Sequence, residues 1–318
     1  MKKLLSIILT VLFVVSLSAC GKDSKDSNTA SGPSVDSNTI EIVNKAFGTT
    51  EDLLKSAKAL KYKNNCVVSV TVDDVTTAVR ASSAVEYIDG ENGRVFATNG
   101  EIKSGETSAS MSLYSDGKDT YGYKAGTTYQ LVGNGVGDYT NGEFAKIKVW
   151  NTSSLKPLNT TIVNTASGGY GFVIDYDFND ASFNFNEFLK DVDNFDAEAL
   201  KDIQFTVTGV TASGIIDSEG RLTSEAVKLV YEYTMEVEVP KTDVDPDNSG
   251  VNTTEIVSKT VKNEISIELT FNYDLTEVTV PDGMTVGSTD EDGEQVKKPT
   301  EISVSDFEKL SASAEADK

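Results

Sequence analysis

Histidine is absent from all 318 residues. Histidine is the commonest general base and a frequent metal ligand, so its absence excludes Ser-His-Asp and Cys-His catalytic sites and zinc sites that need it. The sequence also contains no Walker loop and no G-x-S-x-G motif. With 50 acidic residues, paired carboxylates arise at many spacings and indicate no glycosidase. The sequence therefore predicts a protein that is not an enzyme and needs no cofactor.

One acidic segment has the spacing of a cation-binding loop. Asp243, Asp245, Asp247 and Ser249 recur at every second position, as oxygen ligands do in calcium loops. The segment departs from the EF-hand pattern, because Asn248 stands where glycine is needed and Thr254 where a bidentate glutamate belongs. The alternative, which we favour, is a solvated loop whose acidic residues serve as turn formers.

The two cysteines differ in their surroundings. Cys20 follows a positive Lys2-Lys3 start and an apolar run, Leu4 to Val15, which is the layout of a secretory signal. As a helix that run is about 18 Å long, too short for a hydrocarbon core of about 30 Å. Cys66 precedes Val67 and Val68, and we interpret it as a buried small apolar residue.

The end of the leader, Leu17-Ser18-Ala19-Cys20, resembles the lipobox of bacterial lipoproteins. The resemblance implies that Cys20 receives a diacylglyceryl group and becomes the new N-terminus. Two acyl chains suffice for stable anchoring. The expected location is therefore extracytoplasmic, with the protein anchored to the bacterial cell membrane through the lipid on Cys20. The alternative is an ordinary signal peptide that happens to end in cysteine.

The net charge of the chain limits the kinds of partner that it can bind. Removing the leader leaves 26 basic and 50 acidic residues, a net charge of −24. Such a surface repels nucleic acid, which requires a basic footprint, and it also repels anionic lipid head groups. The partners expected are therefore the membrane, reached through the acyl chains, and a lipid-like ligand, while any protein partner stays unknown.

Periodicity of the apolar residues predicts few helices and many strands. Ile40, Val43 and Phe47 predict a helix that ends at Gly48, and capping signals at Thr49 and Asp52 predict a second helix over 50–60. A third short helix is expected over 186–195. Alternation predicts the strands, namely 66–72, 79–88, 107–114, 120–123, 127–132, 159–165, 170–176, 205–216, 222–239 and 256–273.

Turn residues and glycines mark the connections. Hairpins are expected at Asp116-Gly117, at Ser167-Gly168-Gly169 and at Asp217-Ser218-Glu219-Gly220. Gly133 to Gly137 lacks the third glycine of a dinucleotide loop, and we predict a flexible turn that no helix follows. The strand 222–239 carries seven same-face apolar residues from Val227 to Val239, which predicts continuous cover on one side.

These elements divide the chain into four parts. A leader (1–19) and a flexible tether rich in Ser, Asp and Asn (20–38) precede a β-rich domain (39–282). An acidic, loosely ordered tail follows (283–318), with a brief ordered piece expected over 304–310. The order helix, strands, hairpin, short helix and strand pair, together with the lipobox, resembles the LolA-like and LppX-like lipoprotein superfamily. The resemblance implies an α+β, β-rich fold, a curved antiparallel sheet (half-barrel) packed against a few short helices with an apolar cavity between them.

The resemblance also implies a function. Carriers of that type hold acyl chains in the cavity, and here the expected cavity lies between the sheet and the helices at 50–60 and 186–195. Its candidate lining residues are aromatic, namely Phe172, Tyr176, Phe178, Phe183, Phe185 and Phe188, each with ordinary core packing as the alternative. The predicted function is a tethered, non-catalytic module that binds an apolar or amphipathic ligand. The alternative is a structural or protein-interaction module of the cell envelope without a cavity.

Overall fold

The computed structural model describes residues 35–91, 93–178, 205–240, 254–286 and 298–316. A single large sheet of 12 strands dominates these residues, open and curved rather than closed into a barrel. The elements follow the chain as α2 (Ser37–Ser56), β1 (Ala59–Val72), β2 (Val75–Gly90), β3 (Gly93–Ser104), β4 (Thr107–Asp116), β5 (Thr120–Lys124), β6 (Thr127–Val132), α3 (Val136–Phe144), β7 (Pro157–Asn164), β8 (Tyr170–Tyr176), β9 (Phe205–Ile216), β10 (Leu222–Pro240), β11 (Thr254–Asn272), β12 (Thr300–Ser303) and α6 (Val304–Ala316).

The strand order shows how the sheet is assembled. It runs β12-β6-β5-β4-β3-β2-β1-β11-β10-β9-β8-β7, so two antiparallel meanders meet at the centre, where β1 pairs with β11. The expected β-rich fold with a curved sheet is confirmed. One pairing differs from the prediction, because β12 lies parallel to β6 and makes the sheet mixed.

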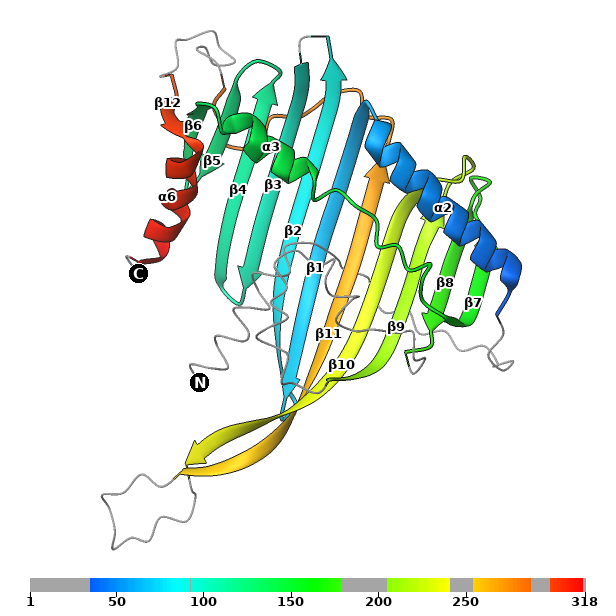
Figure 1. Ribbon diagram of the computed structural model, residues 1–318. Coiled ribbons are helices and arrows are strands. Elements are labelled where there is room, and N and C mark those ends of the chain that lie inside the picture. Colours follow the sequence, from blue (N-terminus) through cyan, green and yellow to red (C-terminus); the bar gives the residue numbers. More distant parts are fainter. Residues whose placement is uncertain (1–34, 92, 179–204, 241–253, 287–297, 317–318) are drawn as a thin grey trace, which may run out of the picture.

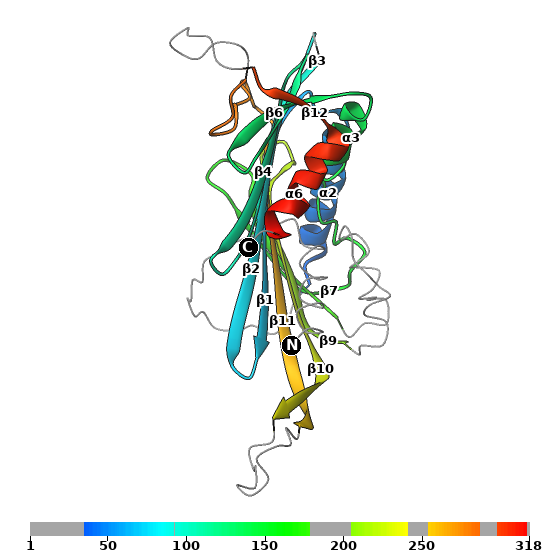
Figure 2. The same cartoon turned by 90° about the vertical axis from the view of Figure 1, so that its left-hand side faces the viewer.

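All three helices lie on the same side of the sheet, which Figure 2 shows edge-on. We call that side the inner face and the opposite side the outer face. Alternation along each strand sends apolar side chains inward and mostly polar ones outward. On β1, for example, Leu60, Tyr62 and Cys66 are at most 1% exposed, whereas Lys63 and Asn65 are exposed. The interpretation of Cys66 as a buried apolar residue is confirmed.

Helix α2 differs from the two helices predicted for the same region. It begins after Asp36, whose carboxylate accepts hydrogen bonds from the backbone N–H groups of Asn38 and Thr39, and it continues through Gly48. Glycine inside a helix costs about 1 kcal/mol. Burial of Val43 and Phe47 on the inner face offsets that cost. The predicted helix end at 60 is also wrong, since Leu60 belongs to β1.

Helix α3 corrects a second prediction, because it begins directly after the glycine segment that we expected no helix to follow. Gly137 and Gly142 weaken its helical signal. Its apolar residues Val136, Tyr139 and Phe144 nevertheless pack against the core. Tertiary packing therefore overrides a poor intrinsic propensity. Strand β3 was not predicted either.

Near the C-terminus, the segment predicted as a loose tail contributes both β12 and α6 to the fold. Phe307 of α6 is fully buried and packs on Gly122 of β5, where an added methyl group would lie 2.5 Å from its ring. The ring also meets Tyr129 edge-on, with 6.1 Å between the ring centroids. This end of the sheet is thereby sealed by a helix.

The paired ends of β10 and β11 extend beyond the rest of the sheet as a two-stranded arm (Figure 1). Val227, Leu229 and Tyr231 are buried, but Tyr233, Met235, Val237 and Val239 are only partly buried. The prediction of continuous cover along the whole strand is therefore wrong. The side chains of β10 are buried only as far as β1 and β9 flank the β10–β11 pair.

Candidate functional site

The middle of the inner face is a continuous apolar surface built by neighbouring strands. The strand register places Val227 opposite Ile267 and Leu229 opposite Ile265. The equivalent rows of β1 and β9 continue the surface on either side. We call these residues the inner apolar patch: Cys66, Val68, Val210, Ala212, Val227, Leu229, Ile265 and Ile267, all between 0% and 8% exposed.

Polar side chains mark the two ends of this patch along β10 and β11. At one end Glu225 stands opposite Leu269, and at the other Tyr231 stands opposite Asn263. Leu269 and Asn263 are six residues apart, which corresponds to about 20 Å along a strand. The arrangement is a buried apolar layer with the Glu225 carboxyl and the Asn64 amide at one end and the Asn263 amide at the other.

Glu225 is completely buried, and one of its two carboxyl oxygens has a partner. Oε2 accepts a hydrogen bond of 3.0 Å from the backbone N–H of Trp150, while Oε1 has none. Burial raises the pKa of Glu225 to about 8, the Trp150 hydrogen bond opposes that shift, and the nearby charge of Glu51 adds to it. The carboxyl is therefore mainly protonated at neutral pH.

At the other end of the inner apolar patch, Asn263 is buried, at 3% exposure. Its side chain forms a hydrogen bond with Tyr233, but its Nδ2 donor is unsatisfied. An unsatisfied buried donor costs about 1–3 kcal/mol. The Nδ2 donor of Asn263 is thus buried without an acceptor.

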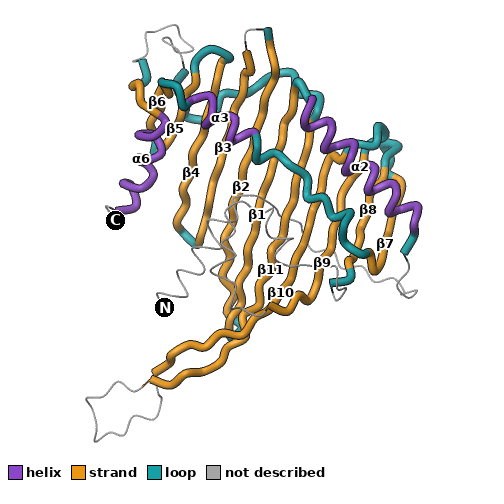
Figure 3. The backbone as a smooth tube through the Cα atoms, viewed as in Figure 1, coloured by secondary structure: helices purple, strands orange, loops and turns teal. Residues whose placement is uncertain are grey.

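A strap formed by residues 145–156 crosses the inner face from α3 to β7 (Figure 3). Several contacts besides that with Glu225 hold it, including the ion pair of Lys156 with Asp177 at 3.1 Å. The Tyr62 hydroxyl donates to the Lys148 carbonyl oxygen at 3.4 Å, Asn151 Nδ2 donates to Glu51 Oε1 at 2.8 Å, and the Thr152 and Tyr176 hydroxyls lie 2.6 Å apart. The strap therefore ties the sheet to α2.

The structure places only some of the predicted cavity residues. Phe172 and Tyr176 lie on the inner side of β8, 3% and 4% exposed, and belong to the core. Burial raises the pKa of Tyr176 to about 12. Phe178 packs partly buried against the same core. Phe183, Phe185 and Phe188 lie outside the described residues.

Other predicted positions also lie outside the described residues, namely Leu17, Ser18, Ala19, Cys20, Asp243, Asp245, Asp247 and Ser249. Within the residues that are described, no group of three or more His, Cys, Asp or Glu side chains could hold a metal ion. None of the described helices is both long and apolar enough to span a membrane.

The described part of the region of the expected cavity is α2, most of whose buried residues precede 50. Val43 and Phe47 are at most 1% exposed and share one core with Leu222 and Ile216. In addition, Thr50 Oγ1 accepts a hydrogen bond of 2.9 Å from the Leu222 backbone N–H. Helix α2 therefore packs flush on the sheet over Val43 to Thr50, and the predicted cavity between the sheet and the helices at 50–60 and 186–195 stays a prediction. The helix expected at 186–195 falls outside the described residues.

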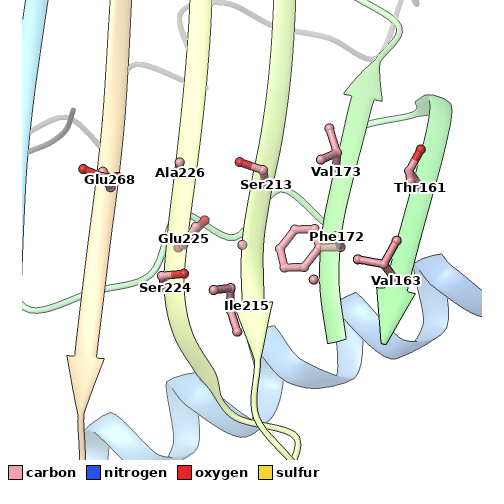
Figure 4. Close-up of a pocket in the computed structure, with 12 residues that line it drawn as sticks. Thr161, Val163, Phe172, Val173, Ser213, Ile215, Ser224, Glu225, Ala226 and Glu268 are labelled. Carbon is pink, nitrogen blue, oxygen red and sulfur yellow. The ribbon is translucent and has the colours of Figure 1, made fainter. Parts of the chain in front are cut away.

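A hollow of about 350 Å³ lies instead on the outer face, over β7 to β11, and Figure 4 shows it from that side. Gly171 and Gly214 are among its lining residues, the Phe172 ring packs close against Gly214, and Val163, Val173 and Ile215 stand around the hollow. These three side chains are 58%, 43% and 45% exposed. The polar lining residues are Thr161, Ser213, Ser224, Glu225 and Glu268, and the predicted cavity residue Phe172 also lines this hollow.

Sequence reasoning missed Glu225 and Asn263, although a signal for both was present. Each occupies an inward position in a strand whose other inward residues are apolar: Glu225 precedes Val227 and Leu229, and Asn263 precedes Ile265 and Ile267. A polar residue within such a row must be buried once the row is buried. The alternation that located the strands could therefore have identified both groups.

No protein-family profile and no curated protein sequence matches this chain. Among solved structures, LprF from Mycobacterium bovis is 12% identical, covers 80% of this chain and 100% of its own length, and gives a TM-score of 0.31. A DUF1329 family protein from Desulfovibrio piger is 7% identical, with 75% and 95% covered and a TM-score of 0.20. Likenesses this weak carry no argument about function.

Proposed function

We propose that this protein is a non-catalytic, extracytoplasmic lipoprotein, tethered through Cys20, that binds an apolar or amphipathic, lipid-like ligand on the inner apolar patch. The observation that carries the proposal is the patch itself, with the unsatisfied amide donor of Asn263 at one end. An acyl chain suits the apolar rows, and an ester or phosphate oxygen of a head group suits the donor.

The position of the patch supports this proposal. Helix α2 packs flush over one end of the inner face, and the inner apolar patch continues along β1, β11, β10 and β9 away from it (Figure 1). A ligand of about 20 Å lying along β10 and β11 would reach from Glu225 to Asn263.

Native mass spectrometry tests ligand binding. The sample should span residues 21–318, because a chain ending at 282 would lack β12 and the buried Phe307. After organic extraction and refolding, incubation with phosphatidylglycerol vesicles should restore a reproducible added mass in the lipid range. A matched outer-face variant, Lys228→Ala, should bind equally well. A mass that stays that of the bare chain would overturn ligand binding.

Mass spectrometry also tests the proposed lipid tether on Cys20. The full chain expressed in a bacterium should be recovered from membranes as a product beginning at Cys20 with the mass of a diacylglyceryl group added. Cys20→Ser should remove both the added mass and the membrane association. Recovery of the unmodified chain in the soluble fraction would contradict the tether.

The alternative function, a structural or interaction module without a ligand, is favoured by one observation. The flush packing of α2 shows that part of the inner face is closed by the protein itself. A bare mass in the experiment above would support this alternative.

A further inference from the structure

Strand β7 is the last strand of the sheet on its side, so one edge of its backbone faces no other described strand. Exposed edges pair readily with further strands unless charges, proline, bulges or covering elements protect them. Pro157 and an irregular register protect only the first residues of β7. The remainder, Asn159 to Asn164, is regularly paired with β8, and no described strand pairs with its other side.

The opposite edge of the sheet is protected. Strand β12 has four residues, it is followed at once by α6, and an ion pair of 2.8 Å between Lys298 and Glu301 stands at its start. Short length, charge and a covering helix all discourage pairing. Among the described residues, the segment Asn159 to Asn164 of β7 is longer than β12 and contains no charged side chain, and one contact reaches it from the start of α2, where the Asp36 backbone N–H donates to Thr160 Oγ1 at 2.8 Å.

The strands behind the β7 edge are almost free of charge. Neither β7 nor β9 contains a charged residue, and β8 contains only Asp175, whose carboxylate accepts a hydrogen bond of 2.9 Å from Thr211. Next to these strands, Lys156 and Asp177 neutralise each other at 3.1 Å. A quarter of the chain is charged and its net charge is −22, so this uncharged end is an exception.

The same end exposes apolar side chains around a hollow. Val163, Val173 and Ile215 stand on three adjacent strands of the outer face, around the hollow drawn in Figure 4. Leu158, at the start of β7, is a further exposed apolar residue. Together, β7 to β9 form a surface suited to association.

We propose that this surface, the edge of β7 with the apolar hollow beside it, binds a second copy of this chain. Two copies related by a two-fold axis would place their β7 edges antiparallel and continue one sheet into the other. The distribution of charge favours a second copy of this chain as the partner. Two molecules of net charge −22 repel each other over most orientations, and the uncharged ends are where that repulsion is weakest. A basic partner is less suited to this surface, because β7 to β9 present no row of carboxylates.

Sedimentation velocity of residues 21–318, over about 1–200 µM protein, tests the proposal. The wild-type chain should form a dimer that dissociates on dilution. Val163→Lys adds a charge beside the edge and should raise the dissociation constant at least tenfold. Val75→Lys adds the same charge at the first residue of β2, which is 67% exposed, and should change the constant less than twofold.

Either of two results would overturn the proposal. One is a wild-type chain that stays monomeric at the highest concentration. The other is a dimer that Val163→Lys leaves intact while the variant keeps its circular dichroism spectrum and melting temperature. A second variant, Ile215→Lys, separates the contributions: it should weaken the dimer if the hollow takes part, and an unchanged constant would exclude the hollow. None of these results depends on ligand binding.

Discussion

The two faces of the sheet arise from the same strands but differ in what holds them. On β10, Val227 and Leu229 point inward and are at most 2% exposed, while Lys228 between them points outward. On the outer face Lys228 forms an ion pair of 2.8 Å with Glu264 across to β11. Exposed ion pairs contribute about 0–1 kcal/mol, whereas burying one large apolar side chain contributes about 1.5–3 kcal/mol. The inner face therefore supplies most of the stability.

The buried residues in the inward rows of β10 and β11 are apolar except at two positions. Glu225 and Asn263 are the buried polar residues that stand in the inward rows of β10 and β11, and each keeps one polar atom without a partner. Stability alone would favour apolar residues at both positions. We infer that the two faces differ in function as well as in energy.

The largest expected difference between the faces comes from adjacent truncations. Leu229→Ala should lower the free energy of unfolding by about 2–5 kcal/mol, because it removes buried methyl groups and leaves a cavity. Lys228→Ala, one residue away, should lower it by less than about 1 kcal/mol. Urea denaturation of both variants measures the difference. Similar costs at the two positions would refute the division between the faces.

A smaller effect should appear as a pH dependence caused by Glu225. Its pKa is about 8 in the folded protein against 4.5 ordinarily, so between these values the folded state holds a proton that the unfolded state has lost. The stabilisation of the folded state by this proton is complete below pH 4.5 and is lost as the pH rises through 8. The free energy of unfolding changes by no more than about 1.4 kcal/mol per pH unit.

The matched variant isolates this contribution. Glu225→Gln keeps an acceptor for the Trp150 N–H but cannot ionise. Between pH 5.5 and 8.5 the melting temperature of the wild-type chain should therefore fall relative to that of the variant. Glu264→Gln on the outer face should leave the wild-type pH profile unchanged. Parallel profiles for wild type and Glu225→Gln would show that the carboxyl is not buried.

The smallest expected change in stability is at Asn263. Replacing it with leucine removes the hydrogen bond with Tyr233 but also removes an unsatisfied donor, so the free energy of unfolding should change by less than about 1 kcal/mol. Ligand occupancy in native mass spectrometry should nevertheless fall. A loss of stability well above 1 kcal/mol would mean that the amide is already satisfied within the folded chain.

Much of the sheet could be predicted from sequence because strands and tight turns are local features. Alternation located β10 and β11, and the expected hairpins form at Gly117, Gly168 and Gly220, each with positive φ. Strand β3 was missed because Val95, Phe96 and Ala97 follow one another without alternation. The continuation of α2 through Gly48 was missed because it depends on packing against the sheet, which lies outside any local window.

The candidate site was less predictable for the same reason. Alternation specifies which residues of a strand face inward, but not which strands become neighbours. The inner apolar patch depends on β1 lying beside β11, and nothing local to either strand indicates that pairing. The outer hollow likewise needs Gly171 and Gly214 to lie on adjacent strands.

The central pairing of β1 with β11 has a consequence for folding. Elsewhere within the two meanders each strand pairs with its neighbour in sequence, but here Lys61 pairs with Asn272. Contacts of such high contact order form slowly, because the entropy of closing the intervening chain is lost before the pairing compensates it. We expect two half-sheets to form early and to join late. Until they join, each half-sheet presents a long open edge to other nascent chains.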